Sequence, residues 1–158
     1  MLNLLQNYLV PDSVYMWTNL GVLPFWLMLL FIPNLKITRI LINSIILPSI
    51  LAATYFYIIY QGILYGDTSV IEAFDLYNGL DNLYVVFSNE IILLTFWLHF
   101  LSINLFLGSW IAYDALKYNM PRTLVFLPLI VVYFTGPLGL LIYWLVRIPY
   151  AKKINFHD

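Results

Sequence analysis

One histidine inside a long apolar segment is the side chain best suited to acid–base chemistry in this chain. His99 lies in the sequence WLHFLSINLFLGSW, and an imidazole exchanges protons near neutral pH. We therefore consider His99 a candidate proton donor or acceptor. The alternative is a neutral histidine that only hydrogen-bonds between packed helices. No metal site is predicted, because His99 has no His or Cys four residues away and the other histidine, His157, lies near the chain end.

Helical periodicity sorts the polar residues of this region into faces. At 100° per residue, Glu90, Trp97 and Asn104 share one face of a helix. The roughly opposite face carries the histidine, in the set His99, Ser102, Phe106, Ser109, Trp110 and Tyr113. Farther along, one face carries a glycine, a tyrosine and an arginine: Gly136, Tyr143 and Arg147. Arg147 ends an apolar segment, so its side chain either lies among helices or reaches out to lipid headgroups.

The composition that surrounds these residues is unlike that of a soluble protein. Of the 158 residues, 63% are apolar and 9% are charged, and the mean hydropathy is +0.87. A soluble domain has about 25% charged residues, so this chain lacks the charges to cover a water-facing surface. The net charge of −1 argues against a nucleic-acid-binding surface, which needs clustered Lys and Arg. The absence of cysteine excludes disulfides, thiolate nucleophiles and Cys-ligated metals, and we expect no cofactor.

Four apolar segments are long enough to cross the hydrocarbon core of a bilayer, which takes roughly 20 residues of helix. They cover residues 14–32, 40–60, 91–113 and 123–146. Pro24 and Pro48 lie inside the first two segments, and Gly136-Pro137 interrupts the last, where it should kink or break the helix. The sequence therefore predicts an all-α integral membrane protein, a bundle of about four transmembrane helices forming one domain over residues 1–158.

A polar connection, residues 61–90, separates the second segment from the third. Before Glu90, which opens the third segment, it carries four acids and no base, namely Asp67, Glu72, Asp75 and Asp81. Residues 69–77 could form a short amphipathic helix. Four basic residues fall on one predicted side of the membrane and three on the other, so the positive-inside rule does not choose an orientation. The acidic connection favours placing both termini outside, whereas a re-entrant fourth segment would put the C-terminus inside.

Residues 96–147 resemble the abscisic-acid-deficiency-four-like family of small membrane proteins, whose plant members are required to make neoxanthin from violaxanthin. The shared pattern begins with a Trp-x-His pair, continues through Gly-Pro-Leu-Gly-Leu and closes with an Arg. It falls on Trp97, His99, Leu105, Phe106, Gly108, Trp110, Asp114, Pro121, Arg122, Gly136, Pro137, Gly139 and Arg147. Residues 23–38 fit the family's first span less specifically, so the resemblance covers most of residues 23–147.

The resemblance implies a carotenoid epoxide isomerase or an accessory protein of that reaction. Opening an epoxide to an allene removes a proton from carbon and delivers one to oxygen, without net redox change. His99, placed between the third and fourth segments, would be one proton-transfer partner, and Asp114 or Tyr113 the other. The lipophilic substrate would lie against the remaining polar and aromatic residues of these segments, namely Trp97, Asn104, Trp110, Gly136, Tyr143 and Arg147.

Two positions depart from the family pattern and support an alternative interpretation. Asn104 stands where the family has an acid, and Ser109 where it has an Arg, so a charge and a possible base are lost. This favours a non-catalytic subunit or assembly factor of a larger membrane complex. A small transporter is disfavoured, because the spans carry few ionisable groups.

The expected partners are those of a membrane protein. They are the lipid bilayer, a lipophilic ligand such as a carotenoid, and another membrane protein or a second copy of the chain, but no nucleic acid. No basic stretch precedes the first apolar residues, as it would in a secretory signal. We therefore expect a location in a bacterial inner membrane or a plastid membrane.

Overall fold

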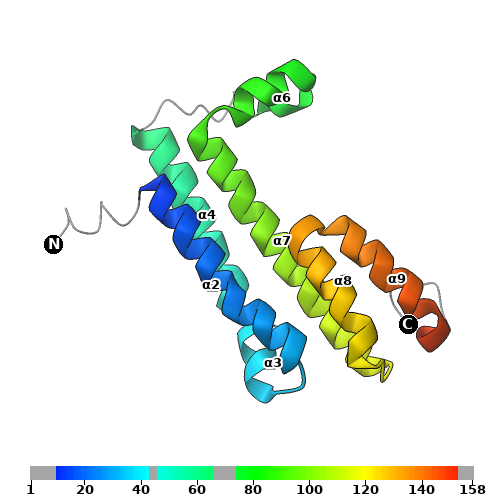
Figure 1. Cartoon of the computed structure of the whole chain (residues 1–158). Helices are drawn as coiled ribbons and strands as arrows, with labels where there is room; N and C mark the ends of the chain where they lie inside the picture. The colour runs from blue at the N-terminus through cyan, green and yellow to red at the C-terminus, as the bar shows by residue number, and fades with distance from the viewer. Residues whose placement is uncertain (1–9, 43–45, 66–73, 153–158) are drawn as a thin grey trace. The chain divides into compact units, whose positions relative to one another are not determined.

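The computed structural model describes residues 10–42, 46–65 and 74–152. In these ranges it contains seven α-helices, one short 3₁₀ helix and no strand, which confirms the all-α prediction. The chain packs into two compact units. The first joins the residues up to Gly21 to Pro48–Phe100, and the second joins Val22–Leu47 to the residues from Leu101 onward. Figure 1 shows the course of the chain through its helices.

Two helices are long and apolar enough to cross a membrane, α2 (Pro11–Phe31) and α7 (Glu90–Lys117). They correspond to the predicted spans 14–32 and 91–113, which are confirmed as helices of spanning length. Helix α2 continues through Pro24. Helix α7 begins with a side-chain cap, because Asn89 Oδ1 accepts hydrogen bonds from the first free backbone N–H groups, at 3.0 and 3.2 Å.

The predicted second span, residues 40–60, falls on two described helices. Helix α3 (Lys36–Ile42) ends inside this range, and α4 (Ile46–Tyr65) begins within it and runs past its end; residues 43–45 lie outside the described part of the chain. Thr38 fixes the turn before α3, because its hydroxyl donates to the Ile32 carbonyl at 2.8 Å. The same carbonyl also accepts from the Leu35 N–H at 3.2 Å, so two donors hold this turn.

The predicted fourth span, residues 123–146, is broken as the sequence indicated. Helix α8 (Arg122–Thr135) and α9 (Pro137–Ala151) meet at Gly136, whose φ of 58° lies in the left-handed region that suits glycine. Pro137 opens α9, where a missing N–H costs nothing. The two helices pack against each other, as the yellow-to-red end of the chain in Figure 1 also shows.

The first unit holds a small apolar core formed by α2, α4 and α7. Val14, Ile58, Leu94 and Leu98 are each at most 5% exposed. The connection 61–90 contributes a 3₁₀ turn, Phe74–Tyr77, and the short helix α6 (Leu80–Phe87). Of the predicted helix 69–77, residues 69–73 lie outside the described part, and 74–77 is the 3₁₀ turn.

Helix α7 buries one row of apolar and small side chains. The row recurs every three or four residues, the spacing of one helix face, and comprises Leu94, Leu98, Leu101, Leu105, Gly108, Ala112 and Ala115. The small members of this row let neighbouring helices approach closely. At Gly108, an added Cβ would lie 2.6 Å from the ring of Trp26 in the second unit, so glycine is required for this ring to pack there.

Candidate functional site

The most polar buried cluster of the second unit joins the end of α7 to the end of α9. Arg147 is 1% exposed and Asp114 is 6% exposed. Arg147 Nε donates to Asp114 Oδ2 at 2.6 Å, and Nη2 donates to Oδ1 at 3.4 Å. The two charges therefore form a buried, two-pronged ion pair, a geometry that the planar guanidinium favours. Arg147 lies among helices and does not reach out to headgroups.

Three aromatic residues complete this cluster. Tyr143 is fully buried, and its hydroxyl donates to Asp114 Oδ2 at 2.7 Å. Tyr118 Oη accepts from Arg147 Nη2 at 3.3 Å, and the guanidinium carbon lies 4.9 Å from the Tyr118 ring centre. The Trp110 ring meets Tyr143 edge-on, with centroids 5.9 Å apart. The Asp114 carboxylate is thus held by an arginine and a phenol at once.

The spacing of the cluster residues explains how two helices assemble it. Tyr143 and Arg147 are four residues apart on the buried face of α9, and residues four apart lie one turn above each other. Trp110, Asp114 and Tyr118 repeat this spacing at the end of α7 and just beyond it. Two rows therefore face each other. The prediction that Tyr143 and Arg147 share a face agrees with their common burial.

A second polar contact lies where α8 breaks. Asn104 is 3% exposed, and its Nδ2 donates to the Tyr133 carbonyl at 3.4 Å. Carbonyls in the last turn of a helix have no partner within the helix, so the amide satisfies one of them. A Cβ at Gly136 would collide with Asn104 Oδ1. The structure therefore brings together the predicted residues Asn104 and Gly136, in contact with a backbone group.

The prediction of a buried His99 was wrong. The His99 side chain is exposed, and its ring centre lies 6.5 Å from that of Tyr55 on α4 in the first unit. The predicted partner Tyr113 is 57% exposed. The physical reason is that α7 packs through its other face. His99 shares its side of α7 with Phe106, which is 67% exposed, whereas the row of Leu, Gly and Ala side chains on the opposite side is buried. Asp114 has all its observed partners in the second unit, so the three predicted catalytic residues have different surroundings.

Trp97 lines a groove in the first unit. Its Nε1 donates to Asn19 Oδ1 at 3.2 Å, and its ring lies 5.8 Å from that of Tyr15. The groove has a volume of about 390 Å³, and its lining combines two rings, two carboxylates and apolar side chains: Pro11, Asp12, Tyr15, Glu90, Leu93, Leu94 and Trp97. Its size is within the range of about 300–1,000 Å³ typical of ligand pockets.

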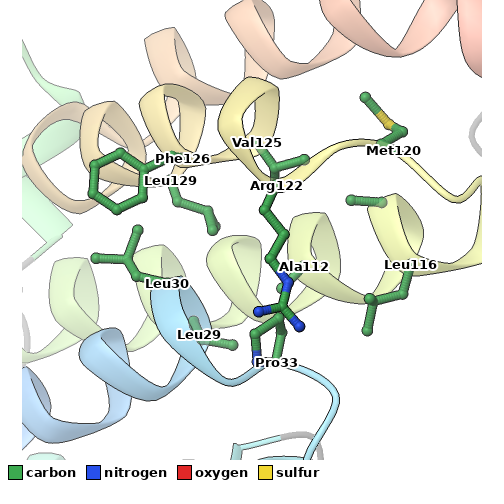
Figure 2. A pocket seen from close by; sticks show the side chains of 11 residues that line it. Leu29, Leu30, Pro33, Ala112, Leu116, Met120, Arg122, Val125, Phe126 and Leu129 are labelled. Atoms are coloured by element: carbon green, nitrogen blue, oxygen red, sulfur yellow. The ribbon is translucent and has the colours of Figure 1, made fainter.

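The cleft shown in Figure 2 lies in the second unit between the end of α2, α7 and the start of α8. Arg122 extends along it toward Pro33, and its Nη1 donates to the Phe31 carbonyl at 3.3 Å. The free space is about 20 Å³, which holds about one water molecule. This cleft is too small for a pigment.

Sequence reasoning missed several of these residues. Tyr118 and Met120 belong to the buried cluster, since the Tyr143 hydroxyl also lies 3.7 Å from Met120 Sδ. Tyr118 follows Asp114 by four residues, a signal that could have been used. Asp12, Tyr15 and Glu90 line the groove beside Trp97, which no local pattern indicates. Within residues 10–42, 46–65 and 74–152, no group of three His, Cys, Asp or Glu side chains could hold a metal ion.

Comparison with known proteins gives one match. The family model described as ABA DEFICIENT 4-like matches residues 13–143. No curated protein and no solved structure matches the chain.

Proposed function

The chain belongs to the ABA DEFICIENT 4-like family, and on that basis we propose that it is an integral membrane protein that isomerises an epoxidised carotenoid. The observation that carries this proposal is the family match, which covers residues 13–143 of the chain. The family is linked to neoxanthin synthesis. The match covers α7 and α8 in full, α2 from Ser13 onward and the first half of α9, up to Tyr143.

The exposure of apolar side chains supports the membrane part of the proposal. Helix α2 has 21 residues and would extend about 32 Å, close to the thickness of roughly 30 Å of a hydrocarbon core. Only 22% of the most apolar stretch of α2 and 33% of that of α7 is buried inside the protein. A core helix of a soluble protein would be mostly covered. Lipid or another membrane protein would cover these surfaces.

The chemistry constrains which residues could take part. Isomerisation breaks the epoxide C–O bond at the carbon that bears the polyene, removes the proton from the next vinylic carbon and turns that C–H electron pair into the second double bond of an allene. The epoxide oxygen takes up a proton, so atoms and charges balance. Asp114 is occupied by Arg147 and Tyr143, which favours a positioning role. His99 is accessible and remains the candidate proton carrier.

The groove beside Trp97 is a second candidate place for the substrate's end ring, on the face of α7 roughly opposite His99, so a ring bound there would react without the histidine. Aromatic and apolar walls suit a hydrocarbon ring, and Asp12 and Glu90 are hydrogen-bond acceptors for its hydroxyl group. The polyene would continue along the apolar side chains Leu93 and Leu94. The ring of a carotenoid with a hydroxyl at each end lies near the bilayer surface, as expected for a groove at the first turns of α2 and α7.

The test is expression in a host that accumulates violaxanthin, with neoxanthin measured by chromatography and protein quantified through a tag. We expect neoxanthin with the unchanged chain and wild-type yield with the control Arg39→Met on the exposed face of α3. Little product with His99→Ala but not with Trp97→Ala would place the reacting ring on the face of the histidine, and the reverse would place it in the groove. Unchanged yield with His99→Ala would remove the histidine from the mechanism. No product from the unchanged, membrane-inserted chain would remove the activity.

A second candidate function is a non-catalytic subunit or assembly factor, favoured by Asn104. The amide donates to the Tyr133 carbonyl, a bond that an ionised carboxylate, the expected family residue, could not make. Under this alternative, the chain keeps the fold of the family but lacks the carboxylate charge at position 104. Pigment extraction from purified protein discriminates the two functions: bound carotenoid supports the first, and a stoichiometric co-purifying membrane protein supports the second.

A further inference from the structure

Helices α8 and α9 are each too short to cross a bilayer. With 14 and 15 residues, they extend about 21 and 22 Å, whereas the hydrocarbon core is about 30 Å thick. Between them, the break at Gly136 keeps its backbone satisfied: the Gly136 N–H donates to the Val132 carbonyl at 2.9 Å, and the Leu140 N–H donates to the Gly136 carbonyl at 3.1 Å. Such a tip tolerates an apolar environment.

The end of α9 returns to the level at which α8 begins. Arg147 binds Asp114 and Tyr118, which belong to the last turn of α7 and the residue after it. Tyr143 contacts Met120, which lies in the connection just before α8. Near the tip, Gly139 lies so close to Val132 that an added Cβ would clash with the Val132 backbone. The two helices therefore form a closed hairpin whose arms begin and end at one level.

The basic residues gather at that level. No charged residue occurs between residues 123 and 146, while Arg122 precedes the hairpin and Lys152 follows it. Arg122 also binds the carbonyl of Phe31, the last residue of α2. The other described basic residues outside the buried pair follow the end of α2 or end α7, namely Lys36, Arg39 and Lys117, and Lys153 lies outside the described part of the chain. Acidic residues are instead concentrated in the connection 61–90.

We propose that α8 and α9 enter and leave the bilayer on the same face, and that the basic residues collected there bind the anionic phospholipid headgroups of that leaflet. The inference rests on the proposed membrane location and does not depend on isomerase activity. In place of the four-against-three division of basic residues, the six basic residues of the described part, Lys36, Arg39, Lys117, Arg122, Arg147 and Lys152, all lie on one side. By the positive-inside rule, this side faces the cytoplasm or its equivalent.

The orientation can be tested directly because the chain has no cysteine. Single cysteines are introduced as Leu35→Cys after α2, as Tyr77→Cys in the acidic connection and after Asp158, and are labelled with a membrane-impermeant maleimide in intact and opened cells. We expect the cysteines at position 35 and at the C-terminus to react only in opened cells, and Tyr77→Cys to react in both. A C-terminal cysteine that reacts together with Tyr77→Cys would overturn the hairpin. Recovery of the chain in the soluble fraction would instead overturn the membrane proposal.

The lipid preference is tested on the full chain, purified from membranes into an equimolar mixture of phosphatidylglycerol and phosphatidylcholine, with retained lipids counted by native mass spectrometry. We expect a preference for phosphatidylglycerol that falls about fivefold for each basic residue removed in the variant Lys36→Gln, Arg39→Gln, Lys152→Gln. These side chains are exposed, so the fold should persist. Asp81→Asn, an exposed change outside this surface, should leave the preference unchanged. Equal retention of both lipids by the unchanged chain would overturn the binding surface.

Discussion

Removal of Arg147 should destabilise the protein more than any surface change, because it leaves the buried Asp114 carboxylate without its positively charged partner. The guanidinium is 1% exposed and gives Asp114 two hydrogen bonds, at 2.6 and 3.4 Å. In Arg147→Met the side chain keeps a similar length, but Asp114 retains only the Tyr143 hydroxyl as a donor in the cluster. Breaking a buried ion pair on one side costs about 3–5 kcal/mol, so we expect a loss of this size in the free energy of unfolding.

The assay is reversible unfolding in detergent micelles, followed by the fluorescence of tryptophan, since Trp110 lies against Tyr143 in the cluster. Arg39→Met is the matched control: it removes the same charge from an exposed position and should change stability by no more than about 0.5 kcal/mol. The double variant Asp114→Asn, Arg147→Met should be more stable than Arg147→Met alone, because it removes the unpaired charge. A cost below about 1 kcal/mol for Arg147→Met, or simple additivity of the two substitutions, would refute the reasoning.

Four further substitutions follow from the geometry, each measured as a change in thermal unfolding in micelles. Gly136→Ala should cost at least about 1–2 kcal/mol, because the backbone φ of Gly136 is 58°. Gly21 lies inside α2 with open space around it, so Gly21→Ala should be neutral or stabilise the protein by up to about 1 kcal/mol. Equal effects of the two substitutions would contradict the role of Gly136 in the turn between α8 and α9. His99→Ala should stay within about 0.5 kcal/mol of the unchanged chain, since the side chain is exposed, and a larger loss would mean that the histidine is structural. Asn104→Asp should cost about 1–3 kcal/mol, because the partly buried Tyr133 carbonyl loses the amide that donates to it, and an unchanged midpoint would show that this bond does not matter.

The faces of α7 could be predicted from the sequence, but not which face is buried. Periodicity correctly placed His99, Phe106 and Tyr113 together. In the helix of a soluble protein the polar side faces outward, but this rule does not hold for a helix that faces lipid. The row that packs inward is marked by small residues, Gly108 and Ala112 among them. Small residues at helical spacing would have been the better guide.

In the fourth segment, the break of the helix could be predicted from the sequence, but the ion pair that its last part forms could not. The break at Gly136-Pro137 follows from the chemistry of those two residues, and the structure confirms it. The pairing of Asp114 with Arg147 did not follow, because 33 residues and a helix reversal separate them. Position near the end of an apolar run made headgroup contact the simpler expectation for the arginine. Only the return of α9 onto α7 brings the two charges together.

The hairpin of α8 and α9 also bears on how the chain would be inserted during synthesis. Residues 123–146 carry no charge, so no ionised side chain would have to be carried through the hydrocarbon core, where each costs about 2.5–3.5 kcal/mol on the scale of translocon insertion. Both arms satisfy their own backbone groups within a helix, and the segment after α9 would never leave the side on which it is made. Under the proposed topology, the part of the protein that follows α7, about a quarter of the chain, could therefore enter the bilayer as a preformed loop. The Asp114–Arg147 ion pair would form after this insertion and hold α9 against α7.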